Sequence, residues 1–265
     1  IEILKYDVAE LEKKGIYVSH SSLEKIVDLS QKLIHERVLP DKAVGILNRV
    51  STSHQIVNVA AVEEEISEMT HIAVQAISGD EAKKLLNIEE EMKKFVIGQN
   101  FAIDQIGSAL KRARAGIRNE SKPIASFLFV GTTGVGKTQT AKTLAKCFFG
   151  NAKNMIRLDM SEYQQVDSIN RLLGTPDGNT KGILTEAVRS KPFAMILLDE
   201  IEKAYPRVLD VFLQILDEGF VTDALGERIN FRNMIIIATS NAGSVLIKQM
   251  VEERKSDKEI KEALI

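Results

Sequence analysis

Cysteine is nearly absent from the sequence. Cys147 is the only cysteine among 265 residues, so no disulfide can form within the chain. A chain of this length can bury about three-quarters of its surface in one or two domains, and its core needs no covalent cross-link. Because disulfides are rare where thiols are kept reduced, a reducing compartment is the simpler assumption. The neighbours "LAKCFF" indicate that Cys147 is a small apolar helix residue rather than a reactive thiol.

An excess of positive charge and a long apolar run are also lacking. Lys and Arg total 35 against 37 Asp and Glu, so there is no overall basic field to attract nucleic acid or anionic lipid. No apolar run approaches the roughly 20 residues that span a bilayer, and no charged-then-apolar leader opens the chain. These absences predict a cytoplasmic protein with no nucleic-acid partner and no membrane partner. The basic run "KRARAGIR", 111–118, lacks interleaved aromatic residues, which favours a solvated helix face or a subunit contact.

The first part of the chain has helical patterns, and we predict a small helical unit over residues 1–55. Ser21 and Glu24 have the spacing of a capping box at the start of one helix. Pro40 suits the first turn of a second helix in "LPDKAVGILNRV". Residues 56–95 read as a connector with short helices, whose acidic run "EEE" we interpret as a solvated helix face rather than an acidic docking site.

From residue 96 onward, short apolar runs alternate with helical patterns. Strand and helix alternation of this kind predicts an α/β core over 96–265, with a parallel sheet covered by helices on both faces. The predicted strands are "SFLFV", "NMIRLD", "FAMILLD" and "MIIIATS".

A glycine-rich segment, "GTTGVGKT", follows the first of these strands and opens a helix. It matches the phosphate-binding pattern G-x-x-x-x-G-K-[ST] in the strand-to-helix context that the pattern requires. An ordinary turn would need neither Lys137 nor Thr138, so we predict a loop whose N–H groups surround phosphate oxygens. Lys137 would reach the β and γ phosphates, and the Thr138 hydroxyl would bind Mg²⁺. The predicted nucleotide-binding residues are Gly131, Thr132, Thr133, Gly134, Val135, Gly136, Lys137 and Thr138.

Two acids emerge together at the end of the buried strand "AMILLDE". In open α/β sheets this edge is where ligands bind. We predict that Asp199 holds Mg²⁺ and that Glu200 orients or deprotonates a water that attacks the γ-phosphoryl group. A pair of surface acids after a strand is the alternative reading.

Asn241 follows the last strand, "MIIIATS", and should lie at the same edge. A neutral amide there could hydrogen-bond the attacking water or the γ-phosphate. An Asn near a Gly is often only a turn residue, so this prediction depends on the two preceding motifs. The four histidines, at 20, 35, 54 and 71, come with no Cys or Asp cluster, and we interpret them as surface or capping residues.

With these motifs placed, nearly the whole chain resembles a Clp-type AAA+ unfoldase of the ClpA, ClpB and ClpC group. The segments "VIGQNFAIDQIGSALKRARAGI", "IRLDMSEY", "GILTEAVRSKPFAMILLDEIEKAYP" and "FRNMIIIATSN" stand in the order of that family's second ATPase module. The front section "ERVLPDKAVGILNRV" is similar to the helical lid of the first module. The chain opens on Ile1 and ends within a helical pattern, so we expect it to be a segment of something longer.

The resemblance implies a set of roles and partners. Val96 and Ile97 would sit against the adenine of ATP, Asp199 and Glu200 would be the Walker B acids, and Asn241 would be the first sensor. Family members form six-membered rings that thread unfolded or tagged polypeptides through a central pore. The family's arginine finger and second sensor would lie beyond residue 265, so this segment alone should hydrolyse ATP poorly.

Two departures from the family pattern bear on function. The segment "GTPDGNTKG", 174–182, stands where the family's pore loop carries an aromatic residue, and its polar side chains offer little apolar area. Either the grip is weaker here or another ring supplies it. No long heptad segment follows the lid, which favours a ClpA-like or ClpC-like partner of a ClpP-type peptidase over a ClpB-like disaggregase.

Three other functions were weighed against an ATP-driven unfoldase. A signalling GTPase would need a guanine-reading N-K-x-D, and the chain contains no Asn-Lys pair. A small-molecule phosphotransferase would not place a carboxylate to activate water. A scaffold that binds nucleotide only to stabilise a ring is disfavoured by Lys137, Asp199 and Glu200, although the pore segment without an aromatic keeps it open.

Overall fold

The structure is a computed structural model that describes residues 1–34, 38–70, 85, 87–113, 119, 121–244, 249–250 and 253. The chain divides into two compact units, one of residues 1–81 with Ser190–Phe193 and one of residues 82–189 with 194–265. The limits expected from the sequence, 1–55, 56–95 and 96–265, stay predictions. Most of the basic run and two of the four histidines, His35 and His71, lie outside the described residues. Within the part described, no helix is both long and apolar enough to cross a bilayer.

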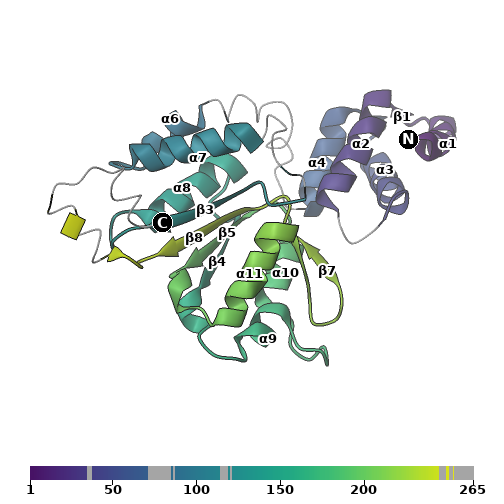
Figure 1. Ribbon diagram of the computed structural model, residues 1–265. Helices are drawn as coiled ribbons and strands as arrows, with labels where there is room; N and C mark the ends of the chain where they lie inside the picture. Colours follow the sequence, from purple (N-terminus) through teal and green to yellow (C-terminus); the bar gives the residue numbers. More distant parts are fainter. Residues whose placement is uncertain are drawn as a thin grey trace. The chain divides into compact units, whose positions relative to one another are not determined.

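The described residues of the first unit form four helices and one short pair of parallel strands (Figure 1). Apolar residues spaced three or four apart give each of α2, α3 and α4 a buried face, and these three helices pack on one another. The elements are α1 (Glu2–Lys13), β1 (Tyr17–Val18), α2 (His20–Leu33), α3 (Asp41–Ser53), β2 (Ile56–Val57) and α4 (Val59–Thr70).

Two predictions for this unit were wrong in detail. The cap of α2 is Ser19, whose hydroxyl accepts a hydrogen bond from Ser22 N at 3.2 Å, so the capping box expected at Ser21 does not form. The acidic run on α4 is not a uniformly solvated face, because Glu63 pairs with Lys25 and the buried Glu65 pairs with Arg49. Both helices offered several serines or glutamates in a row, and tertiary contacts decided which of them were used.

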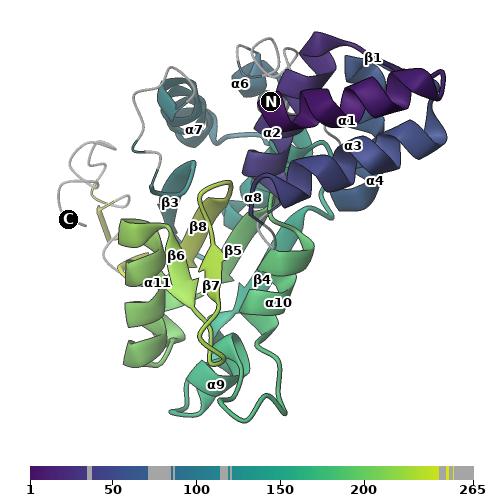
Figure 2. The ribbon, with the colours of Figure 1, turned by 90° about the vertical axis from the view of Figure 1, so that its right-hand side faces the viewer.

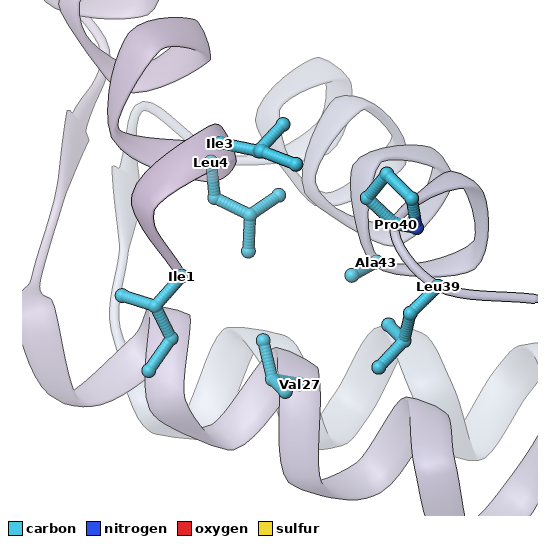
Figure 3. Close-up of a pocket in the computed structure, with 7 residues that line it drawn as sticks. All are labelled: Ile1, Ile3, Leu4, Val27, Leu39, Pro40 and Ala43. Atoms are coloured by element: carbon cyan, nitrogen blue, oxygen red, sulfur yellow. The ribbon is translucent and has the colours of Figure 1, made fainter.

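A small apolar pocket of about 240 Å³ opens at the start of α1 in this unit. Figure 3 shows its lining side chains converging from α1, α2 and the start of α3. None of them carries a polar group that could orient a polar ligand. The lining residues are Ile1, Ile3, Leu4, Val27, Leu39, Pro40 and Ala43.

The second unit is built on a four-stranded parallel sheet in the order β3-β8-β5-β4. This confirms the predicted parallel sheet, and each predicted strand lies within two residues of its observed limits. The strands and helices of this unit are α6 (Ile88–Lys93), α7 (Asn100–Arg112), β3 (Ala125–Val130), α8 (Lys137–Phe149), β4 (Met155–Asp159), α9 (Ser168–Leu173), α10 (Ile183–Ser190), β5 (Met195–Asp199), α11 (Pro206–Glu218), β6 (Phe220–Thr222), β7 (Arg228–Asn230) and β8 (Ile235–Ser240).

Helices cover both faces of this sheet, with α7 and α8 on one side and α10 and α11 on the other (Figure 1). The central strand β5 is buried on both faces, because its alternate side chains contact opposite layers. Ile196 and Leu198 join a core cluster with α9, α10 and α11. The other face packs against α8. Burial on both sides fixes the register of the strands and hence the positions of the residues that follow them.

The antiparallel pair β6 and β7 forms a hairpin that the sequence did not lead us to expect. Figure 2 shows its turn reaching toward α9. Its turn is fixed by Asp223, whose carboxylate accepts hydrogen bonds from Leu225 N at 2.9 Å, Glu227 N at 2.8 Å and Arg189 Nη2 at 2.6 Å. Ala224 N also donates to Leu173 O at the end of α9. The hairpin is therefore tied to both α9 and α10.

Candidate functional site

The candidate site lies at the edge of the sheet where the parallel strands end. β8 lies between β3 and β5, so the residue after β8 lies between the loop that follows β3 and the acids that end β5. Asn241 is that residue. The strand order therefore brings together three segments that are more than 40 residues apart in sequence, as open α/β sheets do at their ligand-binding edge.

The glycine-rich loop passes directly into α8, which begins at Lys137. Gly134 has φ +85° and Gly136 has φ +98°, conformations that a residue with a Cβ rarely adopts. Gly136 is the N-cap of α8 and provides no side chain to bond the first N–H groups of the helix. These donors and the positive end of the helix dipole therefore remain available to an anion.

Lys137 lies at the centre of the site. Its ammonium group donates to Gly131 O at 2.6 Å, to Thr132 O at 3.1 Å and to Asn241 Oδ1 at 2.8 Å. Partial burial lowers the pKa of Lys137, while the nearby carboxylates of Glu202, Asp199 and Glu200 act in the opposite direction. The loop thus holds the Lys137 ammonium group beside the ends of β8 and β5.

Asp199 ends β5 and is held by contacts on both carboxylate oxygens. Its Oδ1 accepts a hydrogen bond of 2.5 Å from the Thr239 hydroxyl, and its Oδ2 is 2.7 Å from Arg157 Nη2. The Asp199 side chain is only 13% exposed, whereas that of Arg157 is 50% exposed. The Asp199 carboxylate is therefore largely shielded from solvent but still has lone pairs free for a cation.

Glu200 follows in a left-handed conformation, with φ 55° and ψ 54°. Its Oε1 accepts from Asn241 Nδ2 at 3.2 Å, and its Oε2 pairs with Lys203 Nζ at 2.5 Å. The hydrogen bond and charge of Glu200 raise the pKa of Lys203. The side chain of Asn241 therefore bridges Lys137 and Glu200 through its two amide atoms.

Glu202 fixes the backbone of Asn241. Its Oε1 accepts a hydrogen bond of 3.0 Å from Asn241 N. Burial by itself raises the pKa of Glu202, but the hydrogen bonds that it accepts, first from Asn241 N, lower that pKa overall. Asn241 is thus held at its backbone N–H by Glu202 and at its side-chain amide by Lys137 and Glu200.

The remaining predicted residues surround this centre. Thr138 is half-buried in the first turn of α8, and its hydroxyl makes no hydrogen bond within the described part of the chain. Val96 is buried, whereas Ile97 is 93% exposed. The adjacent Gln99 joins their segment to the loop, because its Nε2 donates to Val135 O at 2.8 Å. No group of three or more His, Cys, Asp or Glu among the described residues could hold a metal ion by itself.

Sequence reasoning missed several residues of this site. Arg157 and Lys203 each contact one of the two acids, and Thr239 contacts both. Lys203 lies three residues after Glu200, and its spacing could have signalled the pair. Thr239 and Arg157 come from other strands, and only the sheet register identifies them. Arg157 could have been noticed as a charge in the middle of a mostly apolar strand.

The segment 174–182 forms a compact turn between α9 and α10. Gly174 and Lys181 pair in an antiparallel bridge, and Thr175 N donates to Thr180 O at 3.0 Å. Asn179 donates through both its backbone and its side chain to Asp177. These bonds hold a closed turn in which no aromatic side chain is present, as the sequence indicated.

Two protein-family models match the sequence of this chain. A family model described as "AAA domain (Cdc48 subfamily)" matches residues 122–265, and one described as "AAA lid domain" matches residues 1–95. The chain is 40% identical to Chaperone protein ClpB of Bacteroides thetaiotaomicron over 96% of its own length and 30% of that protein. It is 49% identical to an ATP-dependent Clp protease ATP-binding subunit ClpA homolog of Trieres chinensis, over 71% of this chain and 22% of that protein.

The fold also matches a solved relative. A closed-state cryo-EM reconstruction of Hsp104 with ATPγS and FITC casein superposes with a TM-score of 0.80 and 34% identity, covering 94% of this chain and 45% of that one. The chain spans less than half the length of each of these three relatives. The match over 122–265 covers more than half of the chain and contains the loop, the acids and Asn241. The chain therefore belongs to the AAA domain family, as a Clp-type AAA+ ATPase that joins a lid domain to an ATPase core.

Proposed function

We propose that the second unit binds ATP with Mg²⁺ at the β3, β8 and β5 edge and hydrolyses it. The observation that carries this proposal is the continuous set of hydrogen bonds from Lys137 through Asn241 to Glu200. These hydrogen bonds connect the cation that would bind phosphate with the carboxylate that would activate the attacking water. In this proposal the loop N–H groups and Lys137 bind the phosphates, while Val96 and Ile97 lie against the adenine.

Thr138 and Asp199 are the residues that would hold Mg²⁺. Both provide oxygen atoms, the ligands that this ion prefers, and the Asp199 carboxylate keeps unused lone pairs beside the loop. Two protein ligands suffice, because Mg²⁺ is commonly held by one or two protein groups together with phosphates and water. When bound, the ion would offset phosphate charge.

Glu200 is the proposed base for the attacking water, and Asn241 would hydrogen-bond that water or the γ-phosphate. Each carboxylate oxygen of Glu200 has one partner and keeps a lone pair that can accept from water, so a water can bind without displacing Asn241. The contact with Lys203 can also exchange with solvent, because the Lys203 side chain is 47% exposed and exposed ion pairs contribute little to stability. Asn241 can meanwhile keep its hydrogen bond to the same carboxylate.

We also propose that hydrolysis drives the unfolding and translocation of polypeptides by a ring of six copies. Support comes from the relatives, which include chaperones named ClpB and an Hsp104 structure that contains casein, a polypeptide. These names favour a ClpB-like chaperone over the peptidase partner predicted from the sequence. Work with a ClpP-type peptidase stays a second candidate, because the ClpA homolog is 49% identical to this chain.

The test is to give the full-length protein a fluorescent folded substrate and ATP, with and without a ClpP-type peptidase. Loss of fluorescence that requires ATP would support unfolding. Degradation to peptides only when the peptidase is present would favour the second candidate. If ATP is hydrolysed but fluorescence stays unchanged in every mixture, the proposed ATPase activity stands and the proposed unfolding of this substrate is excluded. Light scattering with and without ATP would measure ring assembly in the same samples.

A further inference from the structure

Thr239 contacts both acids of the site through one hydroxyl group. It lies on β8, and only 1% of its surface is exposed. Its Oγ1 donates to Asp199 Oδ1 at 2.5 Å and accepts from Glu200 N at 3.1 Å. A carboxylate can only accept, so the single hydroxyl proton points to Asp199 and an oxygen lone pair receives the N–H of Glu200.

The second of these bonds reaches a residue with an unusual backbone. Glu200 is the one non-glycine residue with positive φ in the described part of the chain. Residues with a Cβ avoid this conformation, and it persists where surrounding contacts impose it. The bond from Glu200 N to Thr239 is such a contact, and it links the direction of the Glu200 side chain to a buried position on the neighbouring strand.

The other partners of the two acids are less fixed. The side chains of Arg157 and Lys203 are about half exposed, so solvent competes for their ion pairs. Thr239 is β-branched, has restricted χ1 rotation and is buried in the sheet. The Thr239 hydroxyl therefore stays in place while the exposed ion pairs of Arg157 and Lys203 exchange with solvent.

We propose that Thr239 is a positioning residue that sets Asp199 and Glu200 as one unit, holding the first for Mg²⁺ and the second for water. The inference depends on the proposed roles of these two acids. Thr239 and Arg157 together take one acceptor position on each Asp199 oxygen, which orients the carboxylate and leaves it capacity for a cation. Residues that orient metal ligands in this way affect metal affinity and activity without touching the metal.

The test compares Thr239→Val, which keeps the shape and removes the hydroxyl, with Thr239→Ser, which keeps the hydroxyl. Calorimetry would measure ADP binding with and without Mg²⁺, and hydrolysis would be measured in the full-length protein. In Thr239→Val we expect metal-free ADP affinity within about twofold of wild type, while the gain in affinity from Mg²⁺ and the hydrolysis rate each fall ~10–100-fold. Thr239→Ser should restore both to within about threefold of wild type.

The outcomes separate this proposal from the one on which it rests. Equal loss of ADP affinity with and without Mg²⁺ in Thr239→Val, or a response of Thr239→Val to Mg²⁺ like that of wild type, would overturn the positioning role. A wild-type protein that binds ADP equally with and without Mg²⁺ and does not hydrolyse ATP would overturn the proposed function itself. If circular dichroism shows that Thr239→Val is unfolded, Thr239→Ala replaces it in the same measurements.

Discussion

Lys137 Nζ lies 2.8 Å from Asn241 Oδ1, so one hydrogen bond joins the glycine-rich loop to the residue that follows β8. An ammonium group has three protons, and Gly131 O and Thr132 O accept the other two. The long side chain of Lys137 is therefore held in place by the loop and by β8 together. A phosphate that binds at this loop would replace some of these acceptors, because all three protons are already used.

Replacing Lys137 by Ala should abolish measurable ATP binding. Charged hydrogen bonds contribute about 1.5–3 kcal/mol each, so the loss of two should weaken binding on the order of 100-fold or more. Isothermal titration calorimetry would measure the affinity. Lys142→Ala, an exposed position on the same helix, is the matched control and should bind like wild type. Unchanged affinity in Lys137→Ala would show that the loop does not bind the nucleotide through this residue.

Glu200→Gln should keep ATP binding and lose hydrolysis. The amide is nearly the same size as the carboxylate and can still accept from Asn241, but it is a much weaker base for water. General-base catalysis contributes ~10²–10⁴-fold, which is the expected loss of turnover in the full-length protein. Glu218→Gln, at the exposed end of α11, is the control. Hydrolysis at the wild-type rate in Glu200→Gln would mean that another group prepares the water.

Asp223→Asn should destabilise the second unit in a pH-dependent way. Burial by itself raises the pKa of Asp223, but the N–H of Glu227, the Arg189 guanidinium and the N–H of Leu225 lower it overall. A carboxyl with a lowered folded-state pKa stabilises the fold above its unfolded pKa, and this stabilisation is lost as pH falls through the folded value. The difference in unfolding free energy between wild type and Asp223→Asn should therefore be about 1–2 kcal/mol at neutral pH.

That difference should stay constant down to about pH 4, near the ordinary pKa of Asp, and shrink at lower pH. Urea unfolding followed by circular dichroism from pH 7 to about pH 2.5 would measure it. Asp210→Asn, which changes an exposed acid on α11, should match wild type at each pH. A difference that does not shrink below pH 4 would exclude the Asp223 charge as its cause.

The sequence predicted those parts of the structure that depend on local pattern. The four strands of the main sheet are short, mostly apolar runs, and Lys137 and Thr138 belong to a loop motif with fixed spacing. Asn241 could be placed at the correct edge because parallel strands end together. The strand order, and with it the position of Asn241 between loop and acids, came only from the structure.

Contacts between residues far apart in the sequence could not be predicted from local sequence patterns. The bond from Thr239 to Asp199 spans 40 residues, and nothing near either residue signals it. The hairpin of β6 and β7 was missed because its strands have three residues each, too few for a clear alternation. The cap of α2 fell on Ser19 rather than Ser21 because three serines in four residues gave equivalent local signals.

The turn 174–182 allows a direct test of the proposed grip on polypeptide. Thr180 is exposed, and only its backbone takes part in the hydrogen bonds that close the turn, so Thr180→Tyr should leave the turn intact. An aromatic ring there would offer apolar area that the present turn lacks. Burying about 50–60 Å² of that area would contribute ~1.4 kcal/mol, a factor of about ten in affinity.

We therefore expect Thr180→Tyr to lower, by on the order of tenfold, the concentration of unfolded polypeptide that half-maximally stimulates ATP hydrolysis in the full-length protein. Thr180→Ser keeps the backbone bonds without adding apolar area, and it should behave like wild type. The basal rate of hydrolysis should be unchanged in both variants, because the hydrogen bonds that close the turn involve none of the residues of the proposed nucleotide site. If the tyrosine leaves the half-maximal concentration unchanged, the turn does not contact polypeptide, and the segment that grips it must be sought elsewhere in the ring.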